Sequence, residues 1–463
     1  MPEHSCDVAI IGAGTAGIAA YRAATEAGAH AVLIERGPGG TTCARVGCMP
    51  SKLLIAAADA AHAARHADLF GVRVDSVRVD GAAVMRRVRE ERDRFVGAVF
   101  ESLGHIPAAR RIGGEARFLD ARTLAVGEHR VAFRSAVIAT GSSPAVPKPL
   151  RGLGDRLLTT DTIFEIDDLP DTLAVLGGGA VGIELAQAMG RLGVAVTLID
   201  SGKAIAGLTH PDLVHAAAEI FAEDMTLLRE TEIEGAESVD GGVRLTWRTA
   251  DGTTGAGRFA KVLAAAGRPP NLSGLDLGAA GLDLDEDGLP RFDPRSFVCE
   301  GAPLVIAGDA NAARPILHEA SRQGTIAGRN AAALARGGSL TAPEPWTPLA
   351  MVFTHPQTAR VGAAYDRKAT DRLIGDSDFC DQGRARIDGM NQGGVRLWAD
   401  HAGRLLGGEM IGPAAEHLAH ILADAITVGA RVQDLLDRPV YHPTVEEGFR
   451  SAVSALGDAM ADL

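Results

Sequence analysis

The sequence predicts an α/β protein with two Rossmann-like dinucleotide-binding domains, followed by a C-terminal α+β domain. Two stretches, 6–36 and 173–200, each run from an apolar strand through a glycine-rich turn into a helix and a second strand. Beyond residue 343 the pattern changes to short strands and two longer helical segments. At 463 residues the chain is also too long for a single hydrophobic core.

The first stretch carries the dinucleotide fingerprint G-x-G-x-x-G at Gly12, Gly14 and Gly17. Glycine at these positions permits a tight turn and lets the backbone approach a pyrophosphate at the positive end of the helix. The next strand ends on Glu35, whose carboxylate is expected to accept a hydrogen bond from a ribose hydroxyl. An isolated G-x-G-x-x-G is a weak signal, but the flanking strand, helix and acid make this one specific.

The same unit recurs at Gly177, Gly179 and Gly182, and its second strand ends on Asp200. The interval from the first glycine to the acid is 23 residues in both copies. Two such units predict two different nucleotides, as a hydride enzyme with a bound flavin and a diffusible nicotinamide requires. An acid at this strand end accepts from a ribose 2′-hydroxyl and repels a 2′-phosphate, so Asp200 favours NAD over NADP.

The segments outside these two units indicate how the domains follow one another along the chain. Helical spacing covers 53–105, short antiparallel strands cover 115–134, and prolines mark linkers before each change of pattern. In the C-terminal part, strands are expected at 350–354, 394–399 and 404–410, and helices at 413–428 and 443–456. The expected domains are the flavin domain, the nicotinamide domain, a return to the flavin domain, and the α+β domain, at 1–148, 149–270, 271–342 and 343–463.

Composition excludes several classes of function. A formal net charge of −13 argues against nucleic acid and anionic membranes as partners, because both require a basic face. No apolar run reaches a spanning length of about 18 residues. The N-terminus enters a strand at once instead of a secretory signal, so a cytoplasmic location is expected. The five cysteines are too few and too scattered for a secreted disulfide scaffold.

Cys43 and Cys48 form the only close cysteine pair in the sequence. The short loop between them permits disulfide distance, and Pro50 can open a helix whose N-terminus would stabilise a Cys48 thiolate. These features favour a redox-active pair. A zinc half-site and two buried thiols are the alternatives, although no second close pair is present to complete a zinc site. Cys6, Cys299 and Cys380 are expected to be small packed residues.

His442 precedes a proline that can open a helix, and Glu447 follows one turn into that helix. A carboxylate beside an imidazole fixes its tautomer, which suits an acid/base that serves thiol–disulfide exchange. Taken alone, the pattern also fits a surface His-Pro at a helix cap. His62 and His66 lie one turn apart on an expected helix, but with no acidic or cysteine companion they indicate a solvated face, and no metal site is expected.

Taken together, these motifs resemble the pyridine nucleotide-disulfide oxidoreductases, and within them the dihydrolipoyl dehydrogenases. The resemblance covers essentially the whole chain. Besides the fingerprints and the cysteine pair with Pro50-Ser51-Lys52, it rests on five short motifs in family order: Ala139-Thr140-Gly141-Ser142, Gly267-Arg268-x-Pro270-Asn271, Gly308-Asp309, Phe353-Thr354-His355-Pro356 and His442-Pro443-Thr444 with Glu446-Glu447.

The resemblance implies roles for matching residues. FAD would be the flavin, with its ADP half at the first fingerprint and Glu35, and the residues expected along the rest of the flavin are Thr42, Lys52, Thr140, Gly141 and Asp309. The nicotinamide domain would use Gly177, Gly179, Gly182, Glu184, Asp200 and Gly267, with Glu184 paired to Lys52 near the flavin. Cys48 would face the flavin and Cys43 the substrate. His442, oriented by Glu447, would act in the partner subunit of a homodimer whose C-terminal domain is the dimerisation domain.

The chain departs from the family pattern near its cysteines. Thr41 replaces a glycine, and Ala44-Arg45 replaces the usual Leu-Asn. The expected reaction passes two electrons between a dihydrolipoyl-type dithiol, free or on a lipoyl carrier domain, and NAD. The alternatives are an NAD(P)H-dependent reductase of another small disulfide and a non-catalytic flavoprotein subunit of a larger complex. The last cysteine is Cys380, so the C-terminal thiol pair of mercuric reductases and large thioredoxin reductases is missing.

Overall fold

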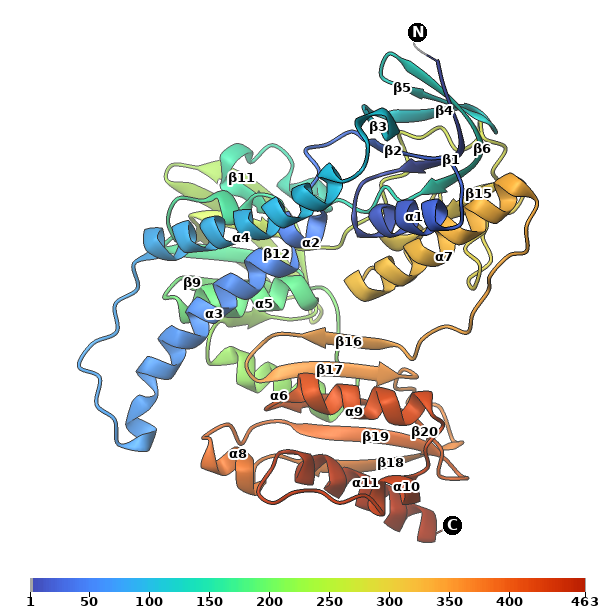
Figure 1. Ribbon diagram of the computed structural model, residues 1–463. Coiled ribbons are helices and arrows are strands. Elements are labelled where there is room, and N and C mark those ends of the chain that lie inside the picture. Colours follow the sequence, from blue (N-terminus) through green and yellow to red (C-terminus); the bar gives the residue numbers. More distant parts are fainter. Residues whose placement is uncertain (1–2, 463) are drawn as a thin grey trace. The chain divides into compact units, whose positions relative to one another are not determined.

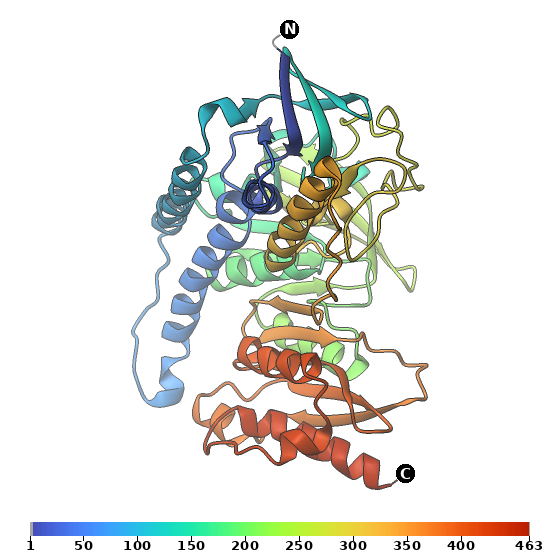
Figure 2. The ribbon, with the colours of Figure 1, turned by 45° about the vertical axis from the view of Figure 1, so that its right-hand side comes forward.

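The computed structural model describes residues 3–462 (Figures 1 and 2). The chain divides into two compact units, each assembled from three segments. Unit 1 comprises residues 1–50, 89–145 and 268–345, and unit 2 comprises residues 51–88, 146–267 and 346–463. Two long helices, α3 (Cys48–Arg65) and α4 (Gly81–Gly104), contain residues of both units. No helix in the described range is long and apolar enough to cross a membrane.

Unit 1 is built on a seven-stranded sheet in the order β3-β2-β1-β6-β5-β4, with β15 also paired to β6. The strands are β1 (Glu3–Ile11), β2 (Ala31–Glu35), β3 (Arg111–Gly113), β4 (Ala116–Asp120), β5 (Thr123–Val126), β6 (His129–Ile138) and β15 (Leu304–Ile306). Strands β3, β2, β1, β6 and β15 pair in parallel, whereas β4, β5 and β6 form an antiparallel meander. Parallel strands with buried, apolar residues require cover on both faces.

Two helices of unit 1 lie side by side, α1 (Thr15–Glu26) and α7 (Leu317–Arg336) (Figures 1 and 2). Their close approach depends on Gly324 and Gly328, because a Cβ at either position would collide with the backbone of Ala16 or Ala20. Short elements complete the unit: α2 (Thr42–Val46), η2 (Ala108–Arg110) and η6 (Gly308–Asn311). The helix pair holds the first glycine turn, at the start of α1, against the sheet.

Unit 2 contains the second dinucleotide fold, a five-stranded parallel sheet in the order β10-β9-β8-β14-β7. These strands are β7 (Leu157–Thr159), β8 (Thr172–Leu176), β9 (Ala195–Ile199), β10 (Thr226–Leu228) and β14 (Lys261–Ala264). A three-stranded antiparallel sheet accompanies it, made of β11 (Thr231–Val239), β12 (Gly242–Thr249) and β13 (Thr254–Phe259). The helices of this part are α5 (Ala180–Arg191) and α6 (Pro211–Ala222), with short helices η1 (Ala67–Phe70), η3 (Lys148–Leu150), η4 (Gly154–Arg156) and η5 (Ile163–Glu165).

The C-terminal part of unit 2 is a five-stranded antiparallel sheet in the order β16-β17-β20-β19-β18. Its strands are β16 (Leu349–Val352), β17 (Gln357–Gly362), β18 (Arg372–Asp378), β19 (Gly394–Asp400) and β20 (Leu405–Gly412). Its helices are α8 (Gly383–Ile387), α9 (Ala415–Thr427), α10 (Val432–Leu436) and α11 (Glu446–Ala461). Buried side chains of α9 and α11, such as Leu418, Leu422, Phe449 and Leu456, share one core with the sheet.

The structure confirms the predicted fold class, with two Rossmann-like folds and a C-terminal α+β part. It also contains elements that the sequence analysis did not anticipate: β17, β18, α8 and α10, and the β11–β12–β13 sheet. Each of these is short or polar on one face, as in β18, where buried and exposed residues are mixed. Such segments carry little of the periodicity on which sequence prediction depends.

Candidate functional site

The first glycine turn joins β1 to α1, and its three glycines are constrained in different ways. Gly12 has a φ of 107°, which favours glycine, and a Cβ there would strike the Ala139 carbonyl. A Cβ on Gly17 would strike the Gly12 carbonyl, so the third glycine lets the helix approach the turn. A Cβ on Gly14 would meet no atom within 4 Å. The turn is thus packed from behind and open at Gly14, as a backbone cradle for a pyrophosphate requires.

Glu35, at the end of β2, folds back onto this turn. Its Oε2 accepts a hydrogen bond from the Ala13 amide at 2.7 Å, and its Oε1 accepts one from the Gly37 amide at 2.7 Å. An ionised carboxylate has about four lone-pair positions, so two amide donors leave room for sugar hydroxyl donors. The carboxylate is therefore fixed beside the cradle, where the ribose of a dinucleotide would lie.

The second turn repeats this geometry between β8 and α5. Gly177 has a φ of 111°, and a Cβ on Gly182 would strike the Gly177 carbonyl. A Cβ on Gly179 would meet nothing within 4 Å. Asp200 follows β9, and its carboxylate lies against the Gly178 position, 3.0 Å from where a Cβ would be. The acid expected to select the nucleotide is therefore beside the turn expected to hold its phosphates.

A second turn with expected cofactor residues in unit 1 follows β6, at Ala139-Thr140-Gly141-Ser142. The Thr140 hydroxyl oxygen is buried and has no hydrogen-bond partner in the part of the chain that the structure describes. Asn271 Nδ2 donates to the Thr140 carbonyl at 3.1 Å, and Ser142 Oγ donates to Asp309 Oδ2 at 2.7 Å. An unpartnered buried hydroxyl is costly unless a ligand supplies its partner. Together with the open cradle at Gly14, this orphaned hydroxyl fits a bound dinucleotide such as FAD.

The two close cysteines lie on consecutive helices, Cys43 in α2 and Cys48 at the first residue of α3. Cys43 is half-buried and Cys48 is exposed. A helix start at Cys48 agrees with the expectation drawn from Pro50, and it places the thiol where a thiolate is favoured. The expected FAD residue Thr42 begins α2 and is exposed.

Thr41, which replaces a family glycine, adopts a left-handed φ of 58°. This conformation is strained for a threonine, but its side chain accepts a hydrogen bond from the Ala44 amide at 3.2 Å and caps α2. The departure thus preserves the turn that a glycine would make. The Nε of Arg45, the other notable departure, is buried without a hydrogen-bond partner in the described range.

The remaining cysteines fall into two groups. Burial, with a smaller contribution from Asp7 at Cys6, raises the pKa of Cys6 to about 12, and burial raises the pKa of Cys299 to about 12. Both are inert packed residues, as expected. The expectation was wrong for Cys380, which is exposed just beyond the end of β18.

Lys52 and Glu184 form an ion pair inside unit 2, with Lys52 Nζ 2.7 Å from Glu184 Oε2. Glu184 is 5% exposed, and its Oε1 accepts a hydrogen bond from the Phe353 amide at 2.8 Å. Lys52 Nζ also lies 4.5 Å from the centre of the Phe353 ring. The sequence analysis paired Lys52 with Glu184 but assigned no role to Phe353, and the only available signal was its place in the Phe353–Pro356 motif.

His442 and Glu447 meet at the start of α11. His442 Nδ1 lies 2.9 Å from Glu447 Oε1, and the Thr444 amide donates to Glu447 Oε2 at 3.1 Å. The hydrogen bond with His442, and next that with Thr444, lowers the pKa of Glu447. An ionised Glu447 accepts from Nδ1–H, so the lone pair of the neutral ring is on Nε2. The imidazole is 79% exposed.

Comparison with known proteins supports one family over the whole length. A family model described as pyridine nucleotide-disulphide oxidoreductase matches residues 6–324, and the model of its dimerisation domain matches residues 349–453. A dihydrolipoyl dehydrogenase of Haloferax volcanii is 32% identical, over 99% of this chain and 98% of the relative. A mercuric reductase of Acidithiobacillus ferrooxidans is 34% identical, over 96% of this chain and 81% of the relative.

Solved structures share the fold. The HOCl-induced flavoprotein disulfide reductase RclA from Escherichia coli, solved as a Cu(II) complex, has a TM-score of 0.82 at 20% identity, over 99% of this chain and 100% of RclA. LpdA from Mycobacterium tuberculosis has a TM-score of 0.80 at 24% identity, over 98% of this chain and 100% of LpdA.

Proposed function

Because this chain belongs to the pyridine nucleotide-disulphide oxidoreductase family, we propose that it passes two electrons between a dihydrolipoyl-type dithiol and NAD. Family membership makes it an oxidoreductase that acts on sulfur groups, and it confirms the cofactors expected from the sequence, FAD and NAD. The observation that carries the finer proposal is the His442–Glu447 hydrogen bond of 2.9 Å, which prepares an exposed imidazole for proton transfer to and from thiols.

The two dinucleotide folds provide the sites for the cofactors. Gly12, Gly14, Gly17 and Glu35 would hold the ADP half of FAD, and Thr140 and Asp309 would contact the rest of it. Gly177, Gly179, Gly182 and Asp200 would hold NAD. Bound FAD supplies a two-electron carrier between the cysteine pair and the nicotinamide. The ion pair with Glu184 holds the Lys52 ammonium in place, and the family resemblance puts this ammonium near the flavin.

The cysteine pair would exchange directly with the substrate. One thiolate of the dithiol attacks Cys43 Sγ of a Cys43–Cys48 disulfide, forming a mixed disulfide and releasing the Cys48 thiolate. The second substrate thiolate then attacks the substrate sulfur of the mixed disulfide and releases Cys43. The substrate leaves as a disulfide, oxidised by two electrons, and the cysteine pair is reduced by two. Each substrate thiol must lose a proton before it attacks.

A histidine supplies the proton acceptor. Its neutral Nε2 takes the proton from the substrate thiol, and Glu447 holds the other nitrogen and stabilises the resulting imidazolium. The dimerisation-domain match supports a homodimer. In that dimer, we assign the proton transfer at each cysteine pair to the partner subunit's His442. The proposal places the enzyme in the cytoplasm, where the reduced thiol pool keeps a dithiol substrate available.

The test is the rate of NAD reduction by dihydrolipoamide, for the wild type and for Cys43→Ser. We expect the variant to lose this activity while NADH still reduces its bound flavin, because that step does not use Cys43. The matched control is Cys380→Ser, which changes an exposed cysteine outside the proposed chemistry and should leave both rates unchanged. An inactive wild type with rapid NADH-dependent flavin reduction would reject the dithiol and keep the reaction class.

A second substrate class has one specific point in its favour, the 34% identity to a mercuric reductase. Hg(II)-dependent oxidation of NADPH or NADH by the wild type is the corresponding assay. We expect it to be slower than dihydrolipoamide oxidation, because the dihydrolipoyl dehydrogenase of Haloferax volcanii matches 99% of this chain and is itself covered over 98% of its length, against 96% and 81% for the mercuric reductase. A faster Hg(II)-dependent rate would reverse the assignment. If the flavin-containing protein turned over neither dihydrolipoamide nor Hg(II), the hypothesis of a non-catalytic flavoprotein subunit would be favoured.

A further inference from the structure

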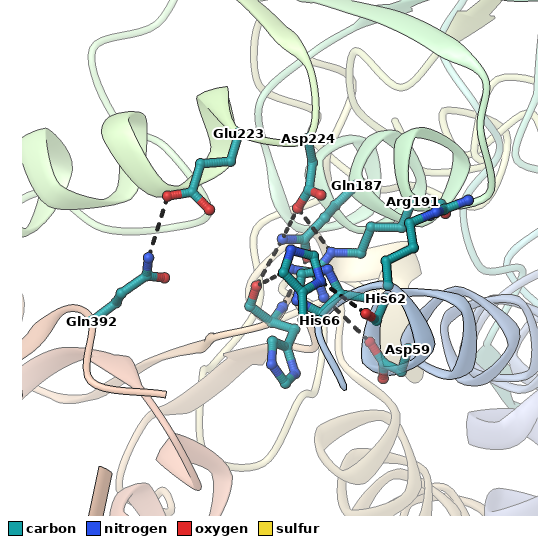
Figure 3. Close-up of polar contacts among 10 residues, drawn as sticks. Asp59, His62, His66, Gln187, Arg191, Glu223, Asp224 and Gln392 are labelled. Atoms are coloured by element: carbon teal, nitrogen blue, oxygen red, sulfur yellow. Dashed lines mark hydrogen bonds and ion pairs between the residues drawn. The ribbon is translucent and has the colours of Figure 1, made fainter. Parts of the chain in front are cut away.

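A cavity of about 340 Å³ in unit 2 lies outside the machinery described above. Three histidines line it: His62 and His66 on α3, and His355 on the segment between β16 and β17. The glycine turns, Lys52 and His442 do not contribute to its walls. Figure 3 shows the polar contacts that surround it.

The rings of His62 and His66 lie nearly face to face. Their centroids are 4.1 Å apart and their planes differ by 33°. Rings this close can each turn a nitrogen toward one metal ion, for which zinc–nitrogen distances of about 2.0–2.1 Å are usual. The ring of His355 is 5.5 Å from that of His62 and borders the same space. Histidines one turn apart on a helix form a known type of metal-binding pair.

His66 presents its imidazole in the form that binds metals. His66 Nδ1 lies 2.8 Å from the His62 carbonyl oxygen, which only accepts, so Nδ1 carries the proton and Nε2 carries the lone pair. A backbone carbonyl that fixes the tautomer is the usual outer support of a histidine ligand.

The surroundings of the pair suit a cation better than an anion. The buried guanidinium of Arg191, which lines the cavity, is already matched by Asp224 at 2.8 Å and by Asp59 at 3.5 Å (Figure 3). The carboxylates of Asp68 and Glu223 line the cavity as well. These carboxylates would attract a bound cation and repel an anion.

The wall beside the pair is tied to α5 by hydrogen bonds. Gln187 is 3% exposed, and it both donates to the His355 carbonyl at 2.8 Å and accepts from the His355 amide at 2.8 Å. Arg191 donates to the same carbonyl at 2.9 Å. The backbone of His355 is thus held by three hydrogen bonds with α5, which fix where its side chain begins.

We propose that His62 and His66 form a binding site for a divalent transition-metal ion of borderline softness, Cu(II) or Zn(II). Within residues 3–462, no three His, Cys, Asp or Glu side chains lie ready to hold a metal ion together. In the proposed site, two histidines chelate the ion and water completes the coordination. The ligand atom of His66 is Nε2. Imidazole ligands bind Cu(II) most tightly among the first-row divalent ions, so Cu(II) is the sharpest probe.

The experiment is a titration of Cu(II) into the FAD-loaded protein after its accessible thiols have been alkylated, which removes cysteine as a competing ligand. Affinity is read by competition with a chelator, and the ligand set by the nitrogen couplings of the Cu(II) electron paramagnetic resonance spectrum. The variants are His62→Gln and His66→Gln. His66 is exposed, so its substitution does not endanger folding. The matched control is His420→Gln, because His420 Nδ1 also lies 2.8 Å from the carbonyl one turn back, that of Glu416, on an exposed helix.

We expect one Cu(II) per chain with coupling to two nitrogens. Removal of either ligand should weaken binding by about tenfold or more, since loss of even an outer-shell partner costs a metal site about that much. His66→Gln should retain one nitrogen coupling, and His420→Gln should bind as the wild type does. Wild-type affinity in His66→Gln, or an equal loss in His420→Gln, would overturn the proposal and show binding to scattered surface histidines only.

Discussion

The buried Lys52–Glu184 pair permits a quantitative prediction about unit 2. The substitution is Glu184→Gln, which keeps one carbonyl oxygen for the Phe353 amide but turns an amide NH₂ toward the Lys52 ammonium. The carboxylate side chain is 6% exposed and that of Lys52 is 35% exposed. Breaking a fully buried pair costs about 3–5 kcal/mol. Because Lys52 can turn partly into water, we expect about 2 kcal/mol.

The measurement is thermal unfolding at saturating FAD, so that loss of cofactor does not itself lower the midpoint. A loss of about 2 kcal/mol corresponds to a midpoint lower by about 5 °C for a unit of this size. Lys52→Met should cost at least as much, because it leaves a buried carboxylate with one partner. The double variant should be less destabilised than the sum of the two, since the second change removes a group that is already unpaired.

The control is Glu219→Gln, which alters an exposed carboxylate 3.4 Å from His215 and should change the midpoint little. The refuting result is additivity. If the double variant loses the sum of the single losses, Lys52 and Glu184 are not coupled, and the 2.7 Å pair contributes nothing beyond two separate solvated charges.

Four further predictions concern the cofactor and acid/base residues. Gly14→Ala should fold normally but bind FAD weakly, whereas Gly17→Ala should lower the unfolding midpoint; flavin content and melting curves separate these outcomes. Asp200→Ala should raise the kcat/KM ratio for NADPH over NADH, and an unchanged ratio would remove Asp200 from nucleotide selection. Glu447→Gln should reduce the dihydrolipoamide rate about tenfold and His442→Gln by about 10²–10⁴, with NADH-dependent flavin reduction unaffected in both. Hydrogen bonding lowers the pKa of Glu447, so its ionised form is fully present above the ordinary carboxyl pKa and is lost only as pH falls through the lowered value. We therefore expect that titration of Glu447 does not reduce wild-type activity at mildly acidic pH.

Local spacing was sufficient to predict much of the fold. The two glycine turns, the acids after β2 and β9 and the His442–Glu447 pair each lie within one strand–turn–helix segment or one helical turn. A short stretch of sequence fixes their relative placement. The contacts that join distant segments could not be read in this way. The Phe353 amide meets Glu184 only because the chain returns to α5 after 169 residues, and no local pattern encodes that return.

The same limit applies to the surroundings of the histidine pair. In sequence, His62 and His66 lack companions, which indicated a solvated face, and His66 is exposed in the structure. The sequence could not show that α5 and the segment before β17 bring Arg191 and His355 to the pair, where His62 is half-buried beside a cavity. Cys380 was misjudged because a cysteine beside an apolar residue gives no sign of which of the two faces inward.

The structure also separates roles that one motif combines. In both turns the first glycine is required by its backbone conformation and the third by the approach of the helix, since a Cβ at Gly17 or Gly182 would strike the preceding carbonyl. These constraints hold with or without a ligand. Only the second glycine, Gly14 or Gly179, faces open space, so packing within the fold gives no reason for its lack of a side chain, whereas close approach of a bound pyrophosphate would give one. A folded, cofactor-poor Gly14→Ala protein would therefore be direct evidence for a dinucleotide at the first turn.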